Sequence, residues 1–377
     1  MHIVFLTNEY PAGKLAHGGI GSFVQNLARN LVLHKIQVSV VGIAVNGSKE
    51  KELDNGVEIH RIKQSAKKYG KFLFNSLAIR KKLKEINSIK PIEIVEGAEL
   101  SFAFLPKKTG YKKVIRMHGG HHFFAVTLHK KPALWRSFQE ITSFKKADAL
   151  IAVSNYVGET TKELVQFKSP YTTIYNFIDL HRFKNSNKES FENNSIVFIG
   201  TICEKKGVQQ LVEAFQYIKE KIPTAKLHLV GRDWTSKTIK SYISYLKTLI
   251  GSEHLNDIIF HGSVSYETIP TILEKAHVCV YPSHMESFGL TVVEAMAMEK
   301  PIVFSDIPPF KEIITDAVSG LACNPMDATD IAEKILILLE NKGLALRFGI
   351  KARVAVLEKF EIATLVERNI QFYKSIL

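Results

Sequence analysis

Apolar runs of four to six residues alternate with amphipathic stretches along most of the chain. The first cycle has an apolar run at residues 3–6, a glycine-rich segment, a stretch of helical period at 22–33 and a second apolar run at 38–41. Continuous short apolar runs are typical of strands buried on both faces, and a helix between two of them indicates a βαβ unit. The pattern therefore predicts a parallel sheet covered by helices.

The same cycle begins again in the second half of the chain. An apolar run at 195–200 precedes a predicted helix at 208–219 and a further run at 226–230. Other predicted strands lie at 92–95, 113–117, 149–153 and 171–174 in the first half, and at 258–261, 278–281 and 301–304 in the second. Two doubly wound α/β units follow from this repetition.

The length of 377 residues also favours two domains, because a single core rarely grows this large. Residues 185–194, NSNKESFENN, have almost no apolar side chain to bury and are the predicted linker. We expect domains at 1–184 and 195–360, with a ligand-binding cleft between them.

Neither membrane spans nor disulfides are expected. The longest apolar runs, such as 331–339, are interrupted by charge, and residues 1–7 lack the basic start of a signal peptide. Cys203, Cys279 and Cys323 are odd in number and far apart, so we expect three small buried side chains. These features predict a cytoplasmic protein.

The net charge of +13 comes from the first half of the chain, where residues 1–180 hold 27 Lys and Arg against 14 Asp and Glu. The excess is densest at 63–90, where basic and apolar residues are interleaved. Such a segment suits an anionic lipid surface, where each basic residue contributes on the order of 1 kcal/mol. A solvated helix face is the simpler alternative. Nucleic acid is not expected, because none of its common binding signatures accompanies the charge.

Ligands of open parallel sheets bind at the carboxyl ends of the strands, so the loops there are the candidate sites. Gly18-Gly-Ile-Gly21 could bring backbone N–H groups to a phosphate, although a flexible turn is the alternative. Its spacing is not that of a dinucleotide-binding loop. Lys205-Lys206-Gly207 could meet an anion but lacks the Walker pattern, and a surface lysine pair is the alternative.

Three histidines, His118, His121 and His122, follow the predicted strand at 113–117. No nearby carboxylate or thiolate completes a metal-binding set, so we expect no metal. His118 directly follows the strand end and is the best placed to donate to a sugar hydroxyl or a phosphate.

Two acids, Glu286 and Glu294, lie on either side of a loop-to-helix junction that ends before Pro301. A carboxylate accepts two hydrogen bonds and matches the paired hydroxyls of a sugar or ribose. The N–H groups at the helix start, on Phe288, Gly289 and Leu290, would face an anion. A capping acid and a solvated acid are the alternative interpretation.

Taken together, these motifs resemble those of the retaining glycosyltransferases of family 4, which have the GT-B fold. The matching pieces are Gly18–Gly21, His118-Gly119, Ser154, Tyr175–Asp179, Gly200, Lys206-Gly207, Gly231, Gly262 and the stretch Pro282–Ala297, PSHMESFGLTVVEAMA. The last is highly specific, and the resemblance extends over nearly the whole chain.

The resemblance implies two Rossmann-like domains facing a central cleft, with a nucleotide-sugar bound mainly by the second domain and an acceptor by the first. A last helix, within residues 361–377, would cross back onto the first domain. It implies His118, Lys206 and Glu286 as catalytic residues, with Glu286 holding sugar hydroxyls and Lys206 the phosphate. The other implied substrate-binding residues are Gly18, Gly19 and Gly21 beside the diphosphate, Glu294 at the ribose, Gly231, Ser263 and Val264 near the base, and Gly200, Ser287, Phe288, Gly289 and Leu290. No metal and no other cofactor is implied.

Two positions depart from the family pattern. Thr201 replaces the arginine that helps to hold the diphosphate, and Arg116, Lys205 or Arg232 is the candidate substitute. Glu299 stands where glycine is common.

The expected function is transfer of a sugar, from a UDP-sugar, to a glycan or lipid-linked acceptor in cell-envelope polysaccharide or lipopolysaccharide synthesis. The basic first half adds the expectation of peripheral binding at the inner face of the plasma membrane. A nucleotide-sugar epimerase and a transferase to a small soluble acceptor are alternatives. A third, suggested by Thr201, is a sugar-nucleotide-binding protein without activity.

Overall fold

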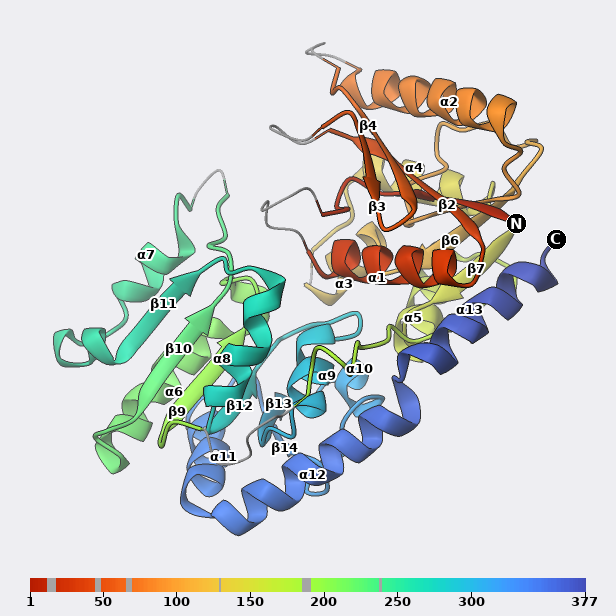
Figure 1. Ribbon diagram of the computed structural model, residues 1–377. Coiled ribbons are helices and arrows are strands. Elements are labelled where there is room, and N and C mark those ends of the chain that lie inside the picture. The colour runs from red at the N-terminus through yellow and green to blue at the C-terminus, as the bar shows by residue number, and fades with distance from the viewer. Residues whose placement is uncertain (12–17, 45–48, 66–69, 129, 185–190, 237–238) are drawn as a thin grey trace. The chain divides into compact units, whose positions relative to one another are not determined.

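The computed structural model describes residues 1–377 except 12–17, 45–48, 66–69, 129, 185–190 and 237–238. The chain divides into two compact units. The first unit comprises Met1–Asn176 and Ala363–Leu377, and the second comprises Phe177–Ile362. Both are built around a sheet with helices on it, as the repeated sequence pattern predicts (Figure 1).

The first unit contains an eight-stranded sheet in the order β3-β4-β2-β1-β5-β6-β7-β8. Its strands are β1 (His2–Leu6), β2 (Gln37–Ile43), β3 (Lys51–Asp54), β4 (Val57–Ile62), β5 (Ile94–Gly97), β6 (Lys112–Met117), β7 (Ala149–Ala152) and β8 (Thr172–Thr173). All neighbours are parallel except β3 and β4. Strand β1 is buried along its whole length, which fits its apolar run from Ile3 to Leu6.

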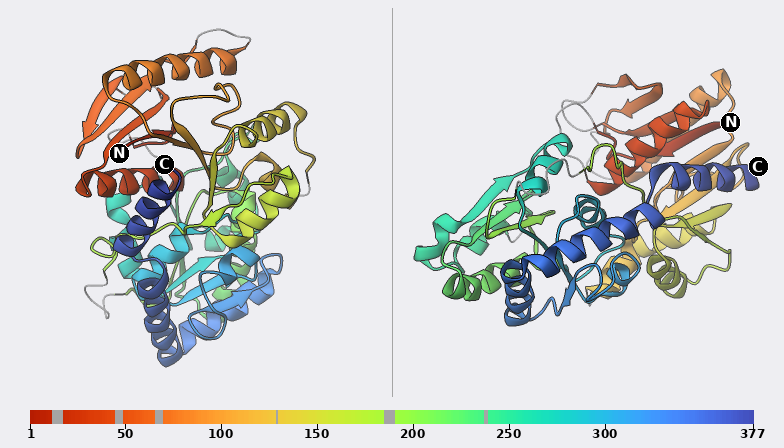
Figure 2. Two further views of the ribbon diagram at one scale, coloured as in Figure 1. Left: turned by 90° about the vertical axis from the view of Figure 1, so that its right-hand side faces the viewer. Right: turned by 60° about the horizontal axis from the view of Figure 1, so that its bottom comes forward.

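Helices cover both faces of this sheet, and Figures 1 and 2 show α1 and α2 on opposite sides of β2 and β4. The helices of the unit are α1 (Gly19–Leu33), α2 (Lys71–Ile89), α3 (His121–Thr127), α4 (Leu134–Phe144), α5 (Asn155–Val165) and most of α13 (Ile362–Ser375). Strand β1 pairs with β2 on one side and β5 on the other, so the connection order reverses there. Loops at such a reversal diverge and leave room for a ligand.

The second unit contains a six-stranded, all-parallel sheet in the order β11-β10-β9-β12-β13-β14. Its strands are β9 (Ser195–Ile199), β10 (Lys226–Val230), β11 (Ile258–Gly262), β12 (Val278–Tyr281), β13 (Ile302–Ser305) and β14 (Leu321–Cys323). The order reverses between β9 and β12, which places the carboxyl ends of these two strands at the equivalent ligand-binding position.

The helices of the second unit pack in pairs, α6 against α11 and α9 against α12. Their bounds are α6 (Val208–Lys221), α7 (Tyr242–Lys247), α8 (Ile269–Lys275), α9 (Leu290–Ala297), α10 (Pro308–Lys311), α11 (Ala328–Glu340) and α12 (Lys342–Lys359). The three cysteines are buried and unbridged. No helix among the described residues has the length and apolar character needed to cross a bilayer.

Most predicted strands and helices are confirmed, but two strands of the first unit were missed. Strands β3 and β4 form a hairpin through Asp54-Asn55-Gly56, in which Asn55 and Gly56 have φ of 47° and 86°. Two successive positive φ values suit Asn-Gly, and that pair was the available sequence signal. The short strand β14 carried no comparable signal.

The two compact units divide between Asn176 and Phe177, eight residues before the expected limit at 184, and the linker at 185–194 stays a prediction. Residues 177–184 belong to the second unit. Ile178 N donates to Phe360 O at 3.1 Å, and the rings of Phe183 and Tyr266 lie 5.7 Å apart between centroids. Phe191 stacks on His277 in the same unit. Residues 185–190 lie outside the described part.

The last helix, α13, is tied to the first unit by a buried polar cluster. Arg116, at the end of β6, donates to Glu96 at 2.7 Å and to Asn369 at 2.5 Å, and Tyr373 donates to Glu96 at 2.7 Å. All four side chains are buried. Arg116 was a predicted substitute for the missing diphosphate arginine, and this prediction is corrected, because its guanidinium is buried and its Nε and Nη2 are bound by these partners.

Candidate active site

The loops that follow β9 and β12 meet at the point where the second sheet reverses its order. A short turn at Glu204–Lys206 ends at Gly207, which has φ of +64°, and α6 begins at the next residue. A Cβ added to Gly207 would lie 1.8 Å from Pro282 O. Glycine is therefore required here by both the backbone conformation and the close approach of the two loops.

Replacing Gly207 with alanine should destabilise the second unit by roughly 2–4 kcal/mol, because the left-handed backbone is strained for alanine and the loops must separate. Gly343→Ala is the matched control. A Cβ there has only the Asn341 side chain at 3.7 Å, and a helical alanine is favoured over glycine. Denaturant unfolding of both variants tests this, and equal stability would contradict the close approach.

The loop contact brings a predicted catalytic pair together. Lys206 Nζ donates to Glu286 Oε1, and Ser283 Oγ donates to the same oxygen at 3.0 Å. Both charged side chains remain partly accessible, with exposed fractions of 18% for Lys206 and 12% for Glu286. A cation and an acceptor thus stand side by side at the sheet reversal, suited to a ligand with a phosphate and adjacent hydroxyls.

The next three loops are held together through their backbones. Gly200 N donates to Val230 O and Gly231 N to Gly262 O, both at 2.9 Å. A Cβ on Gly231 would lie 1.8 Å from Gly200 O, so this glycine is needed for close packing. The carboxyl ends of β9, β10 and β11 therefore form one continuous edge, which Ser263 and Val264 extend.

The structure distinguishes among the three residues that were predicted to substitute for the missing arginine. Ile202 N donates to Arg232 O at 2.9 Å, so Arg232 is carried by the loop directly beside Thr201, and its side chain is exposed. Lys205 is half-buried on the Lys206 turn, and its carbonyl accepts a hydrogen bond from His284 N at 3.0 Å. Both remain candidates, whereas Arg116 does not.

Glu294, in α9, is buried and accepts a hydrogen bond from Tyr266 Oη at 2.9 Å. Burial raises the pKa of Glu294 to about 7, although the Tyr266 hydrogen bond and the charge of Arg182 oppose the shift. Arg182 lies over the Tyr266 ring at 4.8 Å. Tyr266 and Arg182 were missed by sequence reasoning, since neither belongs to a motif singled out there.

The start of α9 lies in the same unit. Gly289 has φ of +103°, and a Cβ there would meet Phe310 at 2.5 Å, so glycine is required. The Phe288 side chain is buried, with its ring 5.6 Å from that of Phe360, and so contributes to packing. Ser287 and Leu290 are half-buried on either side.

In the first unit, α1 begins at the glycine motif and contacts His118 through Phe23. Gly18 caps α1, and Gly19 and Gly21 are in its first turn, so the prediction that the helix begins at residue 22 is wrong by three residues. A Cβ on Gly21 would lie 2.0 Å from Glu9 O. Phe23, in the next turn, contacts His118 edge-on at 6.0 Å between ring centroids.

His118 is buried just beyond the end of β6. Burial and the charge of Arg116 lower the pKa of His118 to about 3, so its ring is neutral near pH 7. A neutral imidazole donates from one nitrogen and accepts at the other, which suits contact with a sugar hydroxyl.

A buried acid that sequence reasoning missed, Glu99, lies beside the His118 loop. The Glu99 carboxyl faces its own backbone N–H and those of His118 and Gly119, which favour its charged form. Burial raises the pKa of Glu99 to about 8, and the charge of Glu140 adds to the shift. The available signal was an acid two residues beyond the end of β5, at the reversal point of the first sheet.

The three histidines do not converge on a metal. His121 Nε2 accepts from Ala133 N at 2.8 Å, while His122 Nδ1 contacts Glu140. Within the described ranges, no group of three or more His, Cys, Asp or Glu side chains is arranged to hold a metal ion.

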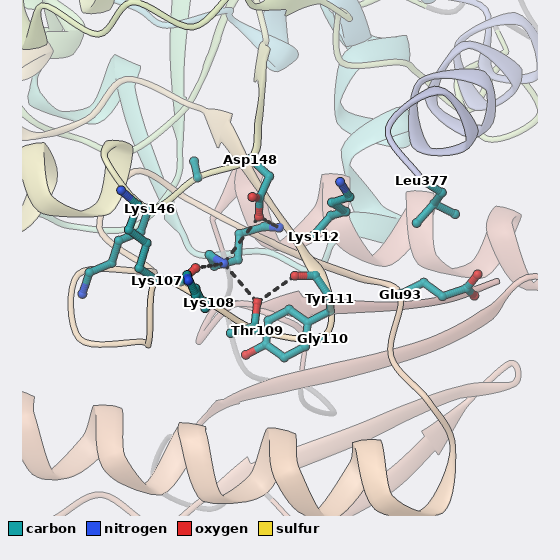
Figure 3. Close-up of a pocket in the computed structure, with 12 residues that line it drawn as sticks. Glu93, Lys107, Lys108, Thr109, Gly110, Tyr111, Lys112, Lys146, Asp148 and Leu377 are labelled. Carbon is teal, nitrogen blue, oxygen red and sulfur yellow. Dashed lines mark hydrogen bonds and ion pairs between the residues drawn. The ribbon is translucent and has the colours of Figure 1, made fainter.

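A separate pocket of about 640 Å³ lies in the first unit, at the amino-terminal ends of β6 and β7 (Figure 3). Lys113 Nζ bonds to Lys107 O at 2.9 Å and to Thr109 Oγ1 at 3.0 Å inside it. His118 follows the opposite end of β6. The pocket therefore does not include the predicted site residues.

Two family models match the chain in succession. The model described as Glycosyltransferase Family 4 matches residues 17–182, and the model described as Glycosyl transferases group 1 matches residues 180–355. The chain is 28% identical over 242 residues to N-acetyl-alpha-D-glucosaminyl L-malate synthase of Bacillus anthracis, covering 62% of this chain and 61% of the synthase. It is 24% identical over 270 residues to the capsular polysaccharide biosynthesis glycosyltransferase CapM of Staphylococcus aureus, covering 68% and 67%.

Solved structures show the same fold over the full length. Sucrose-phosphate synthase from Thermosynechococcus elongatus superposes with a TM-score of 0.85 at 18% identity, covering 100% of this chain and 98% of that one. Anabaena HepE in complex with UDP and glucose has a TM-score of 0.78 at 16% identity, covering 99% of both chains. The fold is GT-B. The paired loops at each sheet reversal and the two matching family models together identify the chain as a member of glycosyltransferase family 4.

Proposed function

We propose that this protein is a retaining hexosyltransferase that uses a UDP-sugar and acts on a glycan or lipid-linked acceptor of the cell envelope. The observation that carries the proposal is the Lys206–Glu286 pair at the reversal point of the second sheet. UDP and glucose in the HepE complex favour this donor class, and the capsular role of CapM favours the acceptor class.

In the proposed reaction, the bond between the anomeric carbon and the diphosphate breaks while the acceptor oxygen bonds to the same carbon. The acceptor oxygen approaches from the face that the phosphate leaves, so configuration is retained, and the acceptor proton passes to the departing phosphate. Negative charge grows on the phosphate, and the ammonium of Lys206 stabilises that charge more in the transition state than in the bound donor. Glu286 accepts from sugar hydroxyls and orients the ring.

Roles in the first unit complete the proposal. Neutral His118 donates a hydrogen bond to the transferring sugar, and the buried Glu99 carboxyl lies beside the backbone of the His118 loop. Gly18, Gly19 and Gly21 present the first turn of α1 to the diphosphate. Glu294 holds the ribose from α9.

A melting-shift screen against nucleoside diphosphates and their sugars tests the donor class. UDP and at least one UDP-sugar should raise Tm at concentrations well above Kd, since binding stabilises the folded state by about 2.7 kcal/mol at a hundredfold excess. A shift with other nucleotides but none with UDP would exclude the proposed donor.

Donor binding should weaken as the pH falls through about 7, because the Glu294 pKa is about 7 and the protonated carboxyl offers one acceptor fewer. The expected rise in the Kd of UDP approaches about tenfold per pH unit below that value. Calorimetric titration at several pH values measures it. Glu294→Gln is the control, because it shares any titration of UDP itself and should remove only the part of the profile due to Glu294.

The same pKa shift predicts the stability of the Glu294→Gln variant. The Glu294 carboxyl binds its proton more tightly in the folded state than in the unfolded chain. Its ionisation therefore lowers the stability of the wild type once the pH exceeds the pKa in the unfolded chain, and the loss is complete above the pKa in the folded state. The Tm of the variant minus the Tm of the wild type should therefore increase as the pH rises from about 5 to 8. A constant difference would contradict the shifted pKa.

One alternative is a sugar-nucleotide-binding protein without activity, and the replacement of the usual arginine by Thr201 is its specific basis. Under that alternative, UDP-sugars raise Tm but no UDP is released with any acceptor. Thr201→Arg would then restore binding strength without turnover, whereas under the proposed function the wild type already turns over.

A further inference from the structure

A continuous row of aromatic side chains lies on the first unit, between the start of α2 and the start of α4. Phe72 and Phe104 meet edge-on at 5.2 Å, Phe104 and Trp135 lie 5.9 Å apart, and Trp135 stacks on Phe138 at 5.7 Å between ring centroids. We call Phe72, Phe104, Trp135 and Phe138 the aromatic row. It joins residues that are more than sixty positions apart in the sequence, Phe72 and Trp135.

Three members of the row are exposed, at 42% for Phe72, 59% for Trp135 and 55% for Phe138. Leu134, beside Trp135, is also exposed, as are Leu73 and Leu77 on α2. Scattered exposed apolar residues are ordinary, but a contiguous group that includes tryptophan marks an interaction surface.

The charges around the row have one sign. The segments 71–84 and 130–139 contain no Asp or Glu, and they carry Lys71, Arg80, Lys81, Lys82, Lys84, Lys130, Lys131 and Arg136. The single acid of α2, Glu85, is bound by Lys82 at 2.6 Å. The surface therefore complements an anionic partner.

The exposed side of α2 arranges these two properties in sequence. Leu73, Leu77, Lys81 and Lys84 are spaced by four, four and three residues, so they share one face of the helix. Each of the four is exposed, whereas Leu83 and Ile86 are buried. One face thus presents apolar side chains at its start and ammonium groups further along.

We propose that the aromatic row and the basic face of α2 form one docking surface for an anionic lipid bilayer. The indole of Trp135, with an apolar body and a polar N–H, suits the headgroup region, the phenylalanines add apolar surface, and basic side chains are attracted to anionic lipids. A soluble anionic glycan would use the charges but leaves the exposed leucines without a partner. This inference rests on the proposed function. It adds that the acceptor is reached at a lipid surface, to which the first unit binds.

The sequence offers a direct probe, because it contains two tryptophans, Trp135 and Trp234. In Trp234→Phe, Trp135 is the only indole. Its emission should shift to shorter wavelength with vesicles of phosphatidylcholine and phosphatidylglycerol, and lipids brominated on their acyl chains should quench it. Vesicles of phosphatidylcholine alone should produce a much smaller change.

Three variants separate the two parts of the surface in vesicle co-sedimentation. Trp135→Ser with Phe138→Ser should reduce binding at least about tenfold at all salt concentrations, because apolar burial is lost. Glu replacements of Lys81, Lys82 and Lys84 should remove the part of the binding that salt weakens. Leu346→Ser, an equally exposed apolar position on α12, should bind like the wild type.

The rise in Tm with UDP, measured on every variant, distinguishes a loss of vesicle binding from a loss of donor binding. All variants should retain the wild-type shift, since none alters a proposed donor residue, and a lost shift in all proteins would overturn the proposed function instead. The docking surface would be overturned if the Trp135→Ser/Phe138→Ser variant sedimented with vesicles as well as the wild type does. Unchanged Trp135 emission with vesicles would also overturn it. Emission changes with a soluble anionic polysaccharide but not with vesicles would also overturn it and identify a glycan-binding site.

Discussion

Lys206→Ala should lower kcat for sugar transfer by about a hundredfold to a thousandfold, with a smaller effect on the Kd of the donor. Loss of one preorganised donor to a developing negative charge has an effect of this size. Lys206 lies beside Glu286 at the sheet reversal, where the departing diphosphate is placed in the proposed mechanism. Initial rates with saturating UDP-sugar, measured as UDP release, test the prediction.

Two controls make this result specific. Lys206→Arg keeps the positive charge and should retain more activity than Lys206→Ala. The double variant Lys206→Ala/Glu286→Gln removes the partner charge as well, so it shows whether an unpaired Glu286 contributes to the loss. Wild-type kcat in Lys206→Ala, with UDP still raising Tm, would refute the role of this lysine.

Arg116→Met should destabilise the first unit by about 3–5 kcal/mol, because it leaves the buried Glu96 carboxylate without its cation. The effect should extend to α13, since Arg116 also binds Asn369 on that helix. Urea unfolding followed by circular dichroism measures the loss, and hydrogen exchange across 363–377 measures the release of the helix.

The double variant Arg116→Met/Glu96→Gln is the matched control for the ion pair. It should recover much of the lost stability, because no uncompensated charge remains in the interior. Equal stability of the single variant and the wild type would mean that the cluster does not hold α13.

The positions of the motifs could be predicted because each depends on local rules. A buried parallel strand needs an unbroken apolar run, and a loop at its carboxyl end needs glycine where backbones approach. Gly207 and Gly289 follow these rules, with positive φ in both cases. The hairpin β3–β4 could have been predicted from Asn55-Gly56 by the same reasoning.

The interpretation of Arg116 failed because sequence position does not fix the direction of a side chain. Arg116 is at the carboxyl end of β6, as a ligand-binding residue would be. Its guanidinium points instead to residues 253 positions later in the chain, which no local pattern could connect with it. Glu99 was missed for the related reason that an acid near a strand end reveals its burial only after the loops are packed.

The sequence by itself determined two doubly wound α/β units, the loops that carry chemistry and the family resemblance, since these depend on side-chain period and backbone conformation over a few residues. Only the tertiary structure decided which charges are neighbours. Lys206 meets Glu286 across 80 residues and Tyr266 meets Glu294 across 28. It also decided the unusual pKa values of His118, Glu99 and Glu294, because burial, the largest cause of each, is a property of the packed chain.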